Sequence, residues 1–164
     1  MKVERVSYDV ITPSAARGIL EAIYWKPAIR WVVDEIQVQN EIAWKNIRRN
    51  ELLGTIPMHS VQRAYTGNIQ TPLKQYAADT ITQRNTLFLK GVCYIIRAHF
   101  ALTEKCGQGD TKEKHYNVLL RHLRKGQCYF RPYLGCREFP ADFRIIEASE
   151  TIAPSFYHGT TIDL

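Results

Sequence analysis

The sequence is short of cysteine, and none of its cysteines form a recognisable pair. The four cysteines, at positions 93, 106, 128 and 136, make no CxxC motif, and no His/Cys spacing matches a zinc site. A chain of 164 residues can bury enough surface to be stable without disulfides. We therefore predict free thiols in a reducing compartment, the cytoplasm.

Long apolar runs, glycine-rich phosphate loops and paired carboxylates are missing as well. No run of about 18 apolar residues could span a membrane. The opening MKVERVSYDV lacks the apolar core of a signal peptide. No P-loop or GxGxxG motif occurs, and no carboxylates stand at metal-binding spacing. The sequence thus predicts no membrane contact, no metal and no other cofactor.

What the sequence does have is positive charge with aromatic residues among it. The formal charge is +6 and the isoelectric point is about 9.2, which favours an anionic partner. Cations interleaved with aromatics suit looped or single-stranded RNA, although the same aromatics could simply be strand core. The cations that we expect to contact RNA are Lys26, Arg48, Arg49, Arg121, Arg124, Lys125, Arg131 and Arg137.

Two helices are predicted from apolar spacing and capping signals. The first begins after the cap residue Thr12, with Pro13 in its first turn, and ends near Trp25. The second covers 110–126, with a capping box of Asp110 and Glu113 and a glycine stop. Apolar residues recur at helical spacing in both segments, so each should bury one face.

Strands are predicted around these helices. Residues 28–40 alternate in polarity, with a bulge near Asp34 and Glu35, and 43–52 should be the antiparallel neighbour. We expect 54–85 to be an insertion with little regular structure, apart from a short helix at LKQYAAD. Residues 85–105 alternate clearly, and short strands are expected after 127.

This order of elements predicts an α+β fold. Two helices against an antiparallel sheet indicate a ferredoxin-like (RRM-like) domain with a small β-rich C-terminal part. We place the ferredoxin-like domain at 1–126, including the insertion at 54–85, and the β-rich extension at 127–164.

The start of the second helix is the candidate for chemistry. Its unpaired N–H groups and positive dipole can bind phosphate, and Lys114 and His115 lie in that first turn. A neutral imidazole beside a fixed cation suits RNA cleavage by the neighbouring 2′-OH, which gives a 2′,3′-cyclic phosphate without a metal. The alternative is that both side chains are solvated surface. His122 falls one face around this helix and is expected to be solvated.

Several phrases, taken together, resemble one family. They are PSAARGILEAIYWKPAIRWVVDEIQV, NIRRNE, LKGVCYIIRAHF and KHYNVLLRHLRKGQCYFRPYLGCREFPADF. In this order they are similar to the CRISPR-associated Cas-five family of the RAMP superfamily, d subtype, from type I-C systems. The resemblance covers about residues 2–146.

The resemblance implies a metal-independent endoribonuclease. Such proteins cut the CRISPR repeat transcript at its hairpin, keep the mature guide RNA and join a Cascade-type antiviral complex, and double-stranded DNA is a further candidate partner. The resemblance also implies catalytic roles for Tyr24, in IYWKP, and for Lys114 and His115, in KHY. The local sequence pattern alone predicts that Tyr24 is a packing residue at a helix end.

The sequence departs from the family pattern at both ends. Family members usually begin with a further strand, so either that strand precedes this start or residues 2–10 take its place. The tail after about Glu147 matches poorly. Two other functions therefore stay open: a non-catalytic RNA-binding scaffold and an unrelated basic interaction module.

Overall fold

The structure is a computed structural model that describes residues 4–67 and 73–160. The chain forms two compact units. One, the ribbon unit, contains residues 4–7 and 43–90, and the other, the core unit, contains residues 8–42 and 91–160. Each unit is described by itself.

Helix α1 (Pro13–Ile23) opens the core unit as the sequence predicts. The Thr12 hydroxyl accepts a hydrogen bond from the Ala15 N–H at 3.3 Å, and Pro13 takes the first position of the helix. Tyr24 is the C-terminal cap, and its N–H donates to the Leu20 carbonyl. The helix ends just before the predicted Trp25, because Pro27 disfavours helical geometry in the residue that precedes it.

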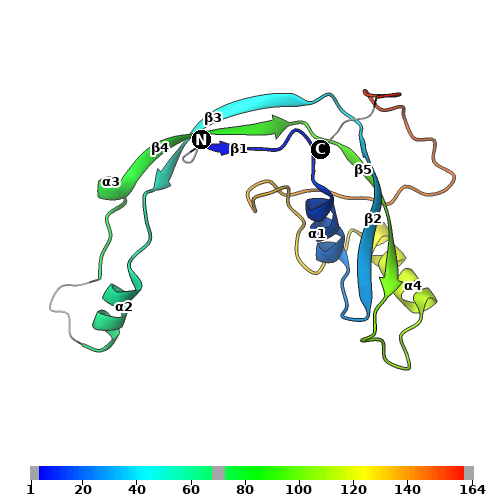
Figure 1. The fold of residues 1–164 in the computed structure, drawn as a ribbon, viewed down its shortest axis with the longest axis horizontal. Coiled ribbons are helices and arrows are strands. Elements are labelled where there is room, and N and C mark those ends of the chain that lie inside the picture. Colours follow the sequence, from blue (N-terminus) through cyan, green and yellow to red (C-terminus); the bar gives the residue numbers. More distant parts are fainter. Residues whose placement is uncertain (1–3, 68–72, 161–164) are drawn as a thin grey trace. The chain divides into compact units, whose positions relative to one another are not determined.

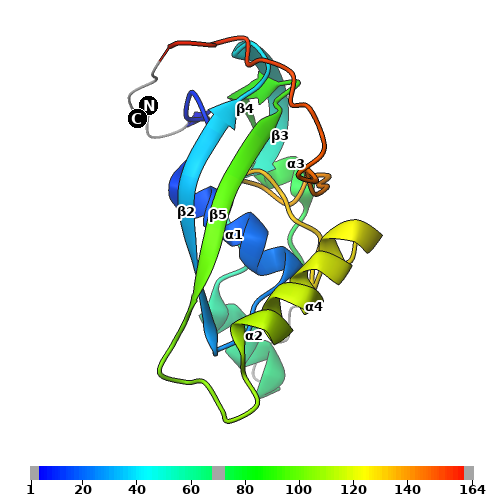
Figure 2. The same cartoon turned by 90° about the vertical axis from the view of Figure 1, so that its right-hand side faces the viewer.

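Strands β2 (Ile29–Val38) and β5 (Tyr94–Leu102) form an antiparallel pair in the same unit. Figure 2 shows the two strands side by side, with α1 and α4 next to them. Trp31 lies opposite Phe100, and the register shifts between Val33 and Glu35. The predicted bulge is therefore confirmed.

Helix α4 (Lys112–Lys125) confirms one predicted end signal and corrects the other. Gly126 takes a left-handed conformation with φ of 63° and stops the helix, as predicted. The capping box of Asp110 and Glu113 is wrong. Thr111 is the cap and its hydroxyl accepts from the Lys114 N–H at 3.2 Å, because the Asp110 carboxylate is bonded elsewhere.

The core unit is held by one hydrophobic cluster that joins α1, β2 and α4. The buried members of this cluster are Ile11, Ala16, Ile19, Ile23, Tyr24, Ile29, Trp31 and Leu119. The Trp31 indole N–H donates to the Tyr24 carbonyl at 2.8 Å. This bond ties the end of α1 to β2 and so fixes the backbone of Tyr24.

The ribbon unit is a three-stranded sheet with little core. β1 (Arg5–Val6), β4 (Ile81–Lys90) and β3 (Ala43–Leu52) lie in the order β1-β4-β3, with β1 parallel to β4. Figure 1 shows β3 and β4 running side by side, with α2 (Met58–Tyr65) and α3 (Ala77–Thr80) in the connection between them. Among the described residues of this unit, only Thr86 is buried.

The structure corrects the prediction for the insertion and for strand pairing. β4 begins at Ile81, inside the segment expected to be irregular, and α2 adds a helix that the sequence did not predict. β3 is largely exposed, and the first residues of β4 are mostly polar, so the strand pattern was hidden in the sequence. β3 pairs with β4 and not with β2, and residues 39–42 and 91–93, which join these strands to β2 and β5, are not in strand conformation.

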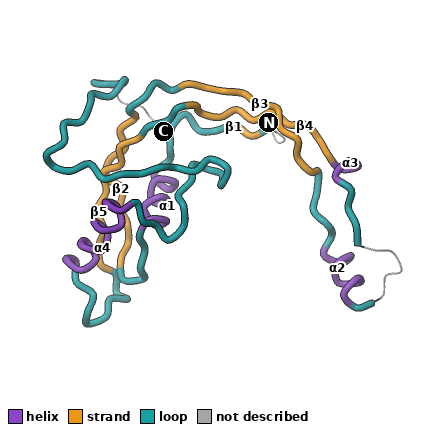
Figure 3. Tube along the Cα trace, turned by 180° about the vertical axis from the view of Figure 1, so that it is seen from behind, coloured by secondary structure: helices purple, strands orange, loops and turns teal. Residues whose placement is uncertain are grey.

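The α+β class is confirmed, and the finer description stays a prediction. The described strands form two sheets, of three and two strands, rather than one ferredoxin-like sheet. Residues 127–160 hold a single isolated bridge, between Tyr133 and Pro140, and otherwise loops (Figure 3). The short strands expected there are therefore wrong for the described residues. The domain division at 126 stays a prediction.

Three smaller expectations concern thiols, the N-terminal residues and membranes. All four cysteines are free, as predicted. Of residues 2–10, which were expected to replace a missing first strand or to follow it, Arg5 and Val6 form a strand and Val10 is buried. No described helix is both long and apolar enough to cross a bilayer.

Candidate active site

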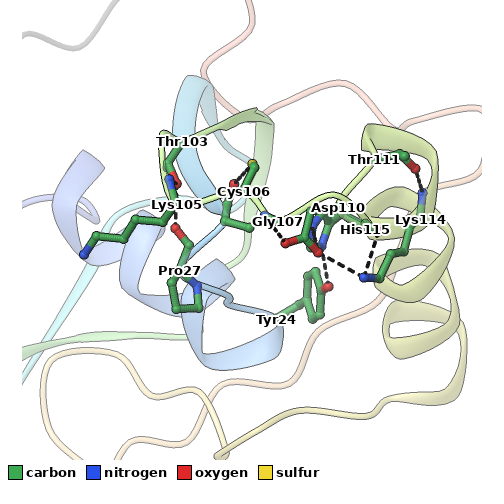
Figure 4. A network of polar contacts seen from close by, with 12 residues as sticks. Tyr24, Pro27, Thr103, Lys105, Cys106, Gly107, Asp110, Thr111, Lys114 and His115 are labelled. Atoms are coloured by element: carbon green, nitrogen blue, oxygen red, sulfur yellow. Dashed lines mark hydrogen bonds and ion pairs between the residues drawn. The ribbon is translucent and has the colours of Figure 1, made fainter.

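A buried hydrogen bond joins two of the predicted catalytic residues. Tyr24 caps the end of α1, and His115 lies in the first turn of α4, 91 residues later. The Tyr24 hydroxyl and Nδ1 of His115 are 2.7 Å apart, as Figure 4 shows. Tyr24 is 5% exposed and His115 is 2% exposed. The fold therefore brings the IYWKP and KHY motifs together at one point.

Asp110 lies beside this pair, although the sequence suggested only a capping role for it. Its Oδ2 accepts from the Gly107 N–H at 3.0 Å, and its Oδ1 accepts from the Lys114 ammonium at 2.9 Å. The same Oδ1 is 3.4 Å from Nε2 of His115. The bonds from Lys114 and Gly107 hold the pKa of the Asp110 carboxyl below its ordinary value.

Lys114 completes the group of side chains in Figure 4. Its ammonium donates to the Gly109 carbonyl at 3.0 Å as well as to Asp110. About half of its side chain is exposed, so the cation faces both the protein and solvent. The positive charge of Lys114 acts on the Tyr24 phenol.

The Tyr24 phenol is held in its neutral form. Burial raises the pKa of Tyr24 above its ordinary value, the positive charge of Lys114 partly opposes this, and Asp110 adds to it. At neutral pH the hydroxyl therefore keeps its proton and can donate it toward His115.

His122 is a member of this site that the sequence reasoning missed. It was expected to be solvated, but its ring is half-buried and meets the Tyr24 ring edge-on, with centroids 5.4 Å apart. Its Nδ1 is 3.1 Å from the Ile23 carbonyl, which can only accept, so that nitrogen carries the proton. The signal was present in the sequence, because a residue seven positions after His115 lies on nearly the same helix face.

The predicted RNA-contacting cations lie on several elements. Lys26 follows α1, and Arg121, Arg124 and Lys125 lie on α4, all exposed. Arg137 is an exposed loop residue. Arg48 and Arg49 lie on β3 in the ribbon unit.

Two of these cations already have an acidic partner. The Arg124 guanidinium bonds Glu147 at 2.8 and 3.2 Å, which raises the pKa of Arg124 and lowers that of Glu147. Arg131 bonds Asp142 at 2.6 Å. Their role in RNA binding stays a prediction, as it does for the other cations. Among the described residues, no cluster of three His, Cys, Asp or Glu side chains could hold a metal ion.

Comparison with known proteins gives the family. The Cas5d family, described as CRISPR-associated protein (Cas_Cas5), matches residues 1–161. A protein of Mannheimia succiniciproducens named CRISPR pre-crRNA endoribonuclease Cas5d is 47% identical over 152 residues, which are 93% of this chain and 68% of the relative. A protein of the same name from Thermus thermophilus is 42% identical over 142 residues, 87% of this chain and 55% of the relative.

Solved structures agree with this result. A crystal structure of a CRISPR-associated protein matches with a TM-score of 0.65 and 27% identity, over 97% of this chain and 66% of that one. A functionally uncharacterized protein from Streptococcus mutans matches with a TM-score of 0.62 and 28% identity, over 96% of this chain and 66% of that one. The chain thus spans between about half and two thirds of the length of these relatives. The resemblance seen in the sequence motifs is confirmed: the chain belongs to the CRISPR-associated Cas5d family.

Proposed function

We propose that the chain is an endoribonuclease that cuts CRISPR repeat RNA by attack of the neighbouring 2′-OH. The observation that carries the proposal is the 2.7 Å contact between the Tyr24 hydroxyl and His115 Nδ1, with the Lys114 ammonium beside it. Two relatives that are 47% and 42% identical to this chain are named pre-crRNA endoribonucleases. Membership of their family and this geometry support the same reaction.

In the proposed reaction Tyr24 faces the RNA and His115 stands behind it. His115 is 2% exposed, and its Nδ1 is occupied by Tyr24, so it is poorly placed to take a proton from RNA directly. The 2′-OH gives its proton to the Tyr24 oxygen while the Tyr24 proton moves to Nδ1 of His115. The neutral phenol alone is too weak a base for this step, and His115 makes it effective.

The rest of the reaction concerns phosphorus. The 2′-oxygen forms a bond to the adjacent phosphorus, the bond from phosphorus to the 5′-oxygen breaks, and that oxygen takes a proton from solvent. The product is a 2′,3′-cyclic phosphate. Lys114 stabilises the charge that grows on the phosphate oxygens, and no step uses a metal.

Burial of the pair supports a second candidate function. With 5% and 2% of their surfaces exposed, Tyr24 and His115 could form a structural hydrogen bond in a scaffold that only binds RNA. In that case RNA would be bound at the exposed cations and would leave uncut. The two candidates make different predictions for cleavage and the same prediction for binding.

The wider role that we propose follows from the family. After cleavage the chain keeps the guide RNA and serves as a subunit of a type I-C Cascade complex in the cytoplasm. The RNA, other Cascade subunits and double-stranded DNA are its proposed partners. The exposed cations Lys26, Arg121 and Lys125 in the core unit, and Arg48 in the ribbon unit, are the proposed contacts to nucleic acid.

A cleavage assay tests the proposal. The purified chain is incubated in EDTA with the repeat RNA of its own genome, and in parallel with a copy that carries a 2′-deoxy sugar at the cut site. The proposal predicts cleavage of the first RNA, with a cyclic phosphate end, and none of the second. Binding without cleavage supports the scaffold, and cleavage of the deoxy copy contradicts the 2′-OH mechanism.

A further inference from the structure

The surroundings of His115 raise a question that the three motif residues do not answer. Its ring is buried among Tyr24 from the end of α1, Phe100 from β5, and the turn before α4. Nδ1 bonds Tyr24, while Nε2 is buried without a hydrogen-bond partner. Leaving a buried polar atom unpaired is costly, so a nearby acceptor is significant.

Asp110 is an acceptor close to Nε2. Its Oδ1 lies 3.4 Å from Nε2, too long for a good hydrogen bond but within ion-pair distance. The carboxylate cannot swing freely, because Gly107 N–H holds Oδ2 and the Lys114 ammonium holds Oδ1. Asp110 is therefore held in the site by two hydrogen bonds.

Charge decides which nitrogen of His115 carries the proton. A carboxylate only accepts, so Asp110 favours a proton on Nε2. Nδ1 is then left with its lone pair and accepts from the Tyr24 hydroxyl, which burial keeps protonated. When Nδ1 takes the Tyr24 proton, the ring becomes a cation that faces the Asp110 carboxylate at 3.4 Å.

We propose that Asp110 is a positioning residue of this site, which sets the tautomer of His115 and holds the positive charge that forms on its ring during cleavage. The order of groups is 2′-OH, Tyr24, His115, Asp110, with the proton passing from the first to the third and staying there until product leaves. Asp110 itself is not protonated. The charge on Lys114 and, more weakly, that on Arg121 act on the same phenol. The catalytic part of this inference rests on the proposed function.

The variant Asp110→Asn tests the inference because it removes the charge and keeps nearly the same shape. We expect single-turnover cleavage at saturating protein to slow by about 10- to 100-fold, while RNA affinity changes by less than about 2-fold. A melting curve shows whether the variant is folded. Asp110→Ala, which removes the acceptor as well, should slow cleavage at least as much.

Asp34→Asn is the matched control. Asp34 also holds a histidine, since its Oδ2 is 2.9 Å from Nδ1 of His99 on β5, but both side chains are exposed and neither touches Tyr24 or His115. This variant should cleave at the wild-type rate. If Asp34→Asn slowed cleavage as much as Asp110→Asn, the effect would be one of general charge and the inference would be overturned.

A spectroscopic measurement makes the inference independent of cleavage. Nitrogen-15 spectra of the His115 ring should show a proton on Nε2 only in the wild-type chain, and a mixture of the two neutral forms in Asp110→Asn. An unchanged ring spectrum in the variant overturns the claim, as does a wild-type cleavage rate. If the wild-type chain cuts no repeat RNA, the proposed function fails, and the ring spectrum still decides whether Asp110 sets the tautomer.

Discussion

The two units of the chain differ in how far their side chains are buried. In the part of the chain that the structure describes, every buried hydrophobic residue belongs to the core unit, and Thr86 alone is buried in the ribbon unit. Chemistry needs atoms held at fixed distances, and Tyr24 and His115 belong to the packed unit. Binding a long polymer needs exposed side chains, and β3 in the ribbon unit offers them.

The ribbon unit also exposes apolar side chains. Leu53, Met58, Tyr65 and Tyr76 are each more than 60% exposed, and α2 has no buried residue. With so few buried contacts, this unit should open locally at a lower free energy than the core unit. The difference in burial therefore predicts that the same substitution has a different effect on stability in the two units.

The largest expected difference concerns stability. Ile23→Ala removes a side chain that is 2% exposed, and we expect it to lower the free energy of unfolding by about 2–5 kcal/mol. Ile81→Ala removes the same atoms from a residue that is 48% exposed in the ribbon unit, and should cost less than about 1 kcal/mol. Denaturant titration of both variants measures this. Equal costs would mean that the ribbon unit has a core of its own.

Next in size is the effect of the site on cleavage. His115→Ala and Lys114→Ala should each slow cleavage by about 100-fold or more and leave most of the RNA affinity, because these groups act in the transition state. His99→Ala is the control, since His99 is an exposed histidine of the same unit, and it should cleave normally. If binding fell as steeply as cleavage, Lys114 and His115 would be RNA contacts rather than catalytic groups.

Smaller effects are expected from replacing the predicted RNA-binding cations. These substitutions test whether RNA contacts both units. Arg121→Ala in the core unit and Arg48→Ala in the ribbon unit should each weaken RNA binding several-fold and lower the salt slope of log Kd by about 1. Arg124→Ala should do less, because Glu147 already neutralises that guanidinium. Fluorescence titrations at several salt concentrations measure these slopes. A full effect from Arg121 and none from Arg48 would confine RNA to the core unit.

The smallest expected effect is on acid stability. The pKa of Asp110 lies below its ordinary 3.8 in the folded chain, so its contribution to stability is full above that value and is lost as pH falls through the folded-state pKa. The melting temperatures of wild type and Asp110→Asn should therefore differ most near pH 7 and converge below about pH 3.8. A difference in melting temperature that persisted at low pH would mean that the changed shape of the side chain, and not the lost charge, destabilises the variant.

Local signals account for what the sequence predicted well. Thr12 with Pro13, the bulge near Asp34, and Gly126 each depend on a few adjacent residues, and all three are where the sequence placed them. Strand pairing in the ribbon unit was mispredicted. The first four residues of β4, Ile81–Arg84, are mostly polar, so they looked like part of the irregular insertion.

The site was predictable only in part for the same reason. Lys114 and His115 stood out at a helix start, whereas Tyr24 was indicated only by the family resemblance. Asp110 looked like a cap, and only the folded turn shows that Thr111 caps the helix while Asp110 faces His115. His122 required the recognition that it shares a helix face with His115.

The hydroxyl of Tyr24 is the atom on which the proposed mechanism depends most. The variant Tyr24→Phe removes that one atom and keeps the ring in the core. Single-turnover cleavage of the repeat RNA in EDTA should slow by about 100-fold or more, with RNA affinity and melting temperature close to those of the wild type. Cleavage by Tyr24→Phe at the wild-type rate would contradict the mechanism.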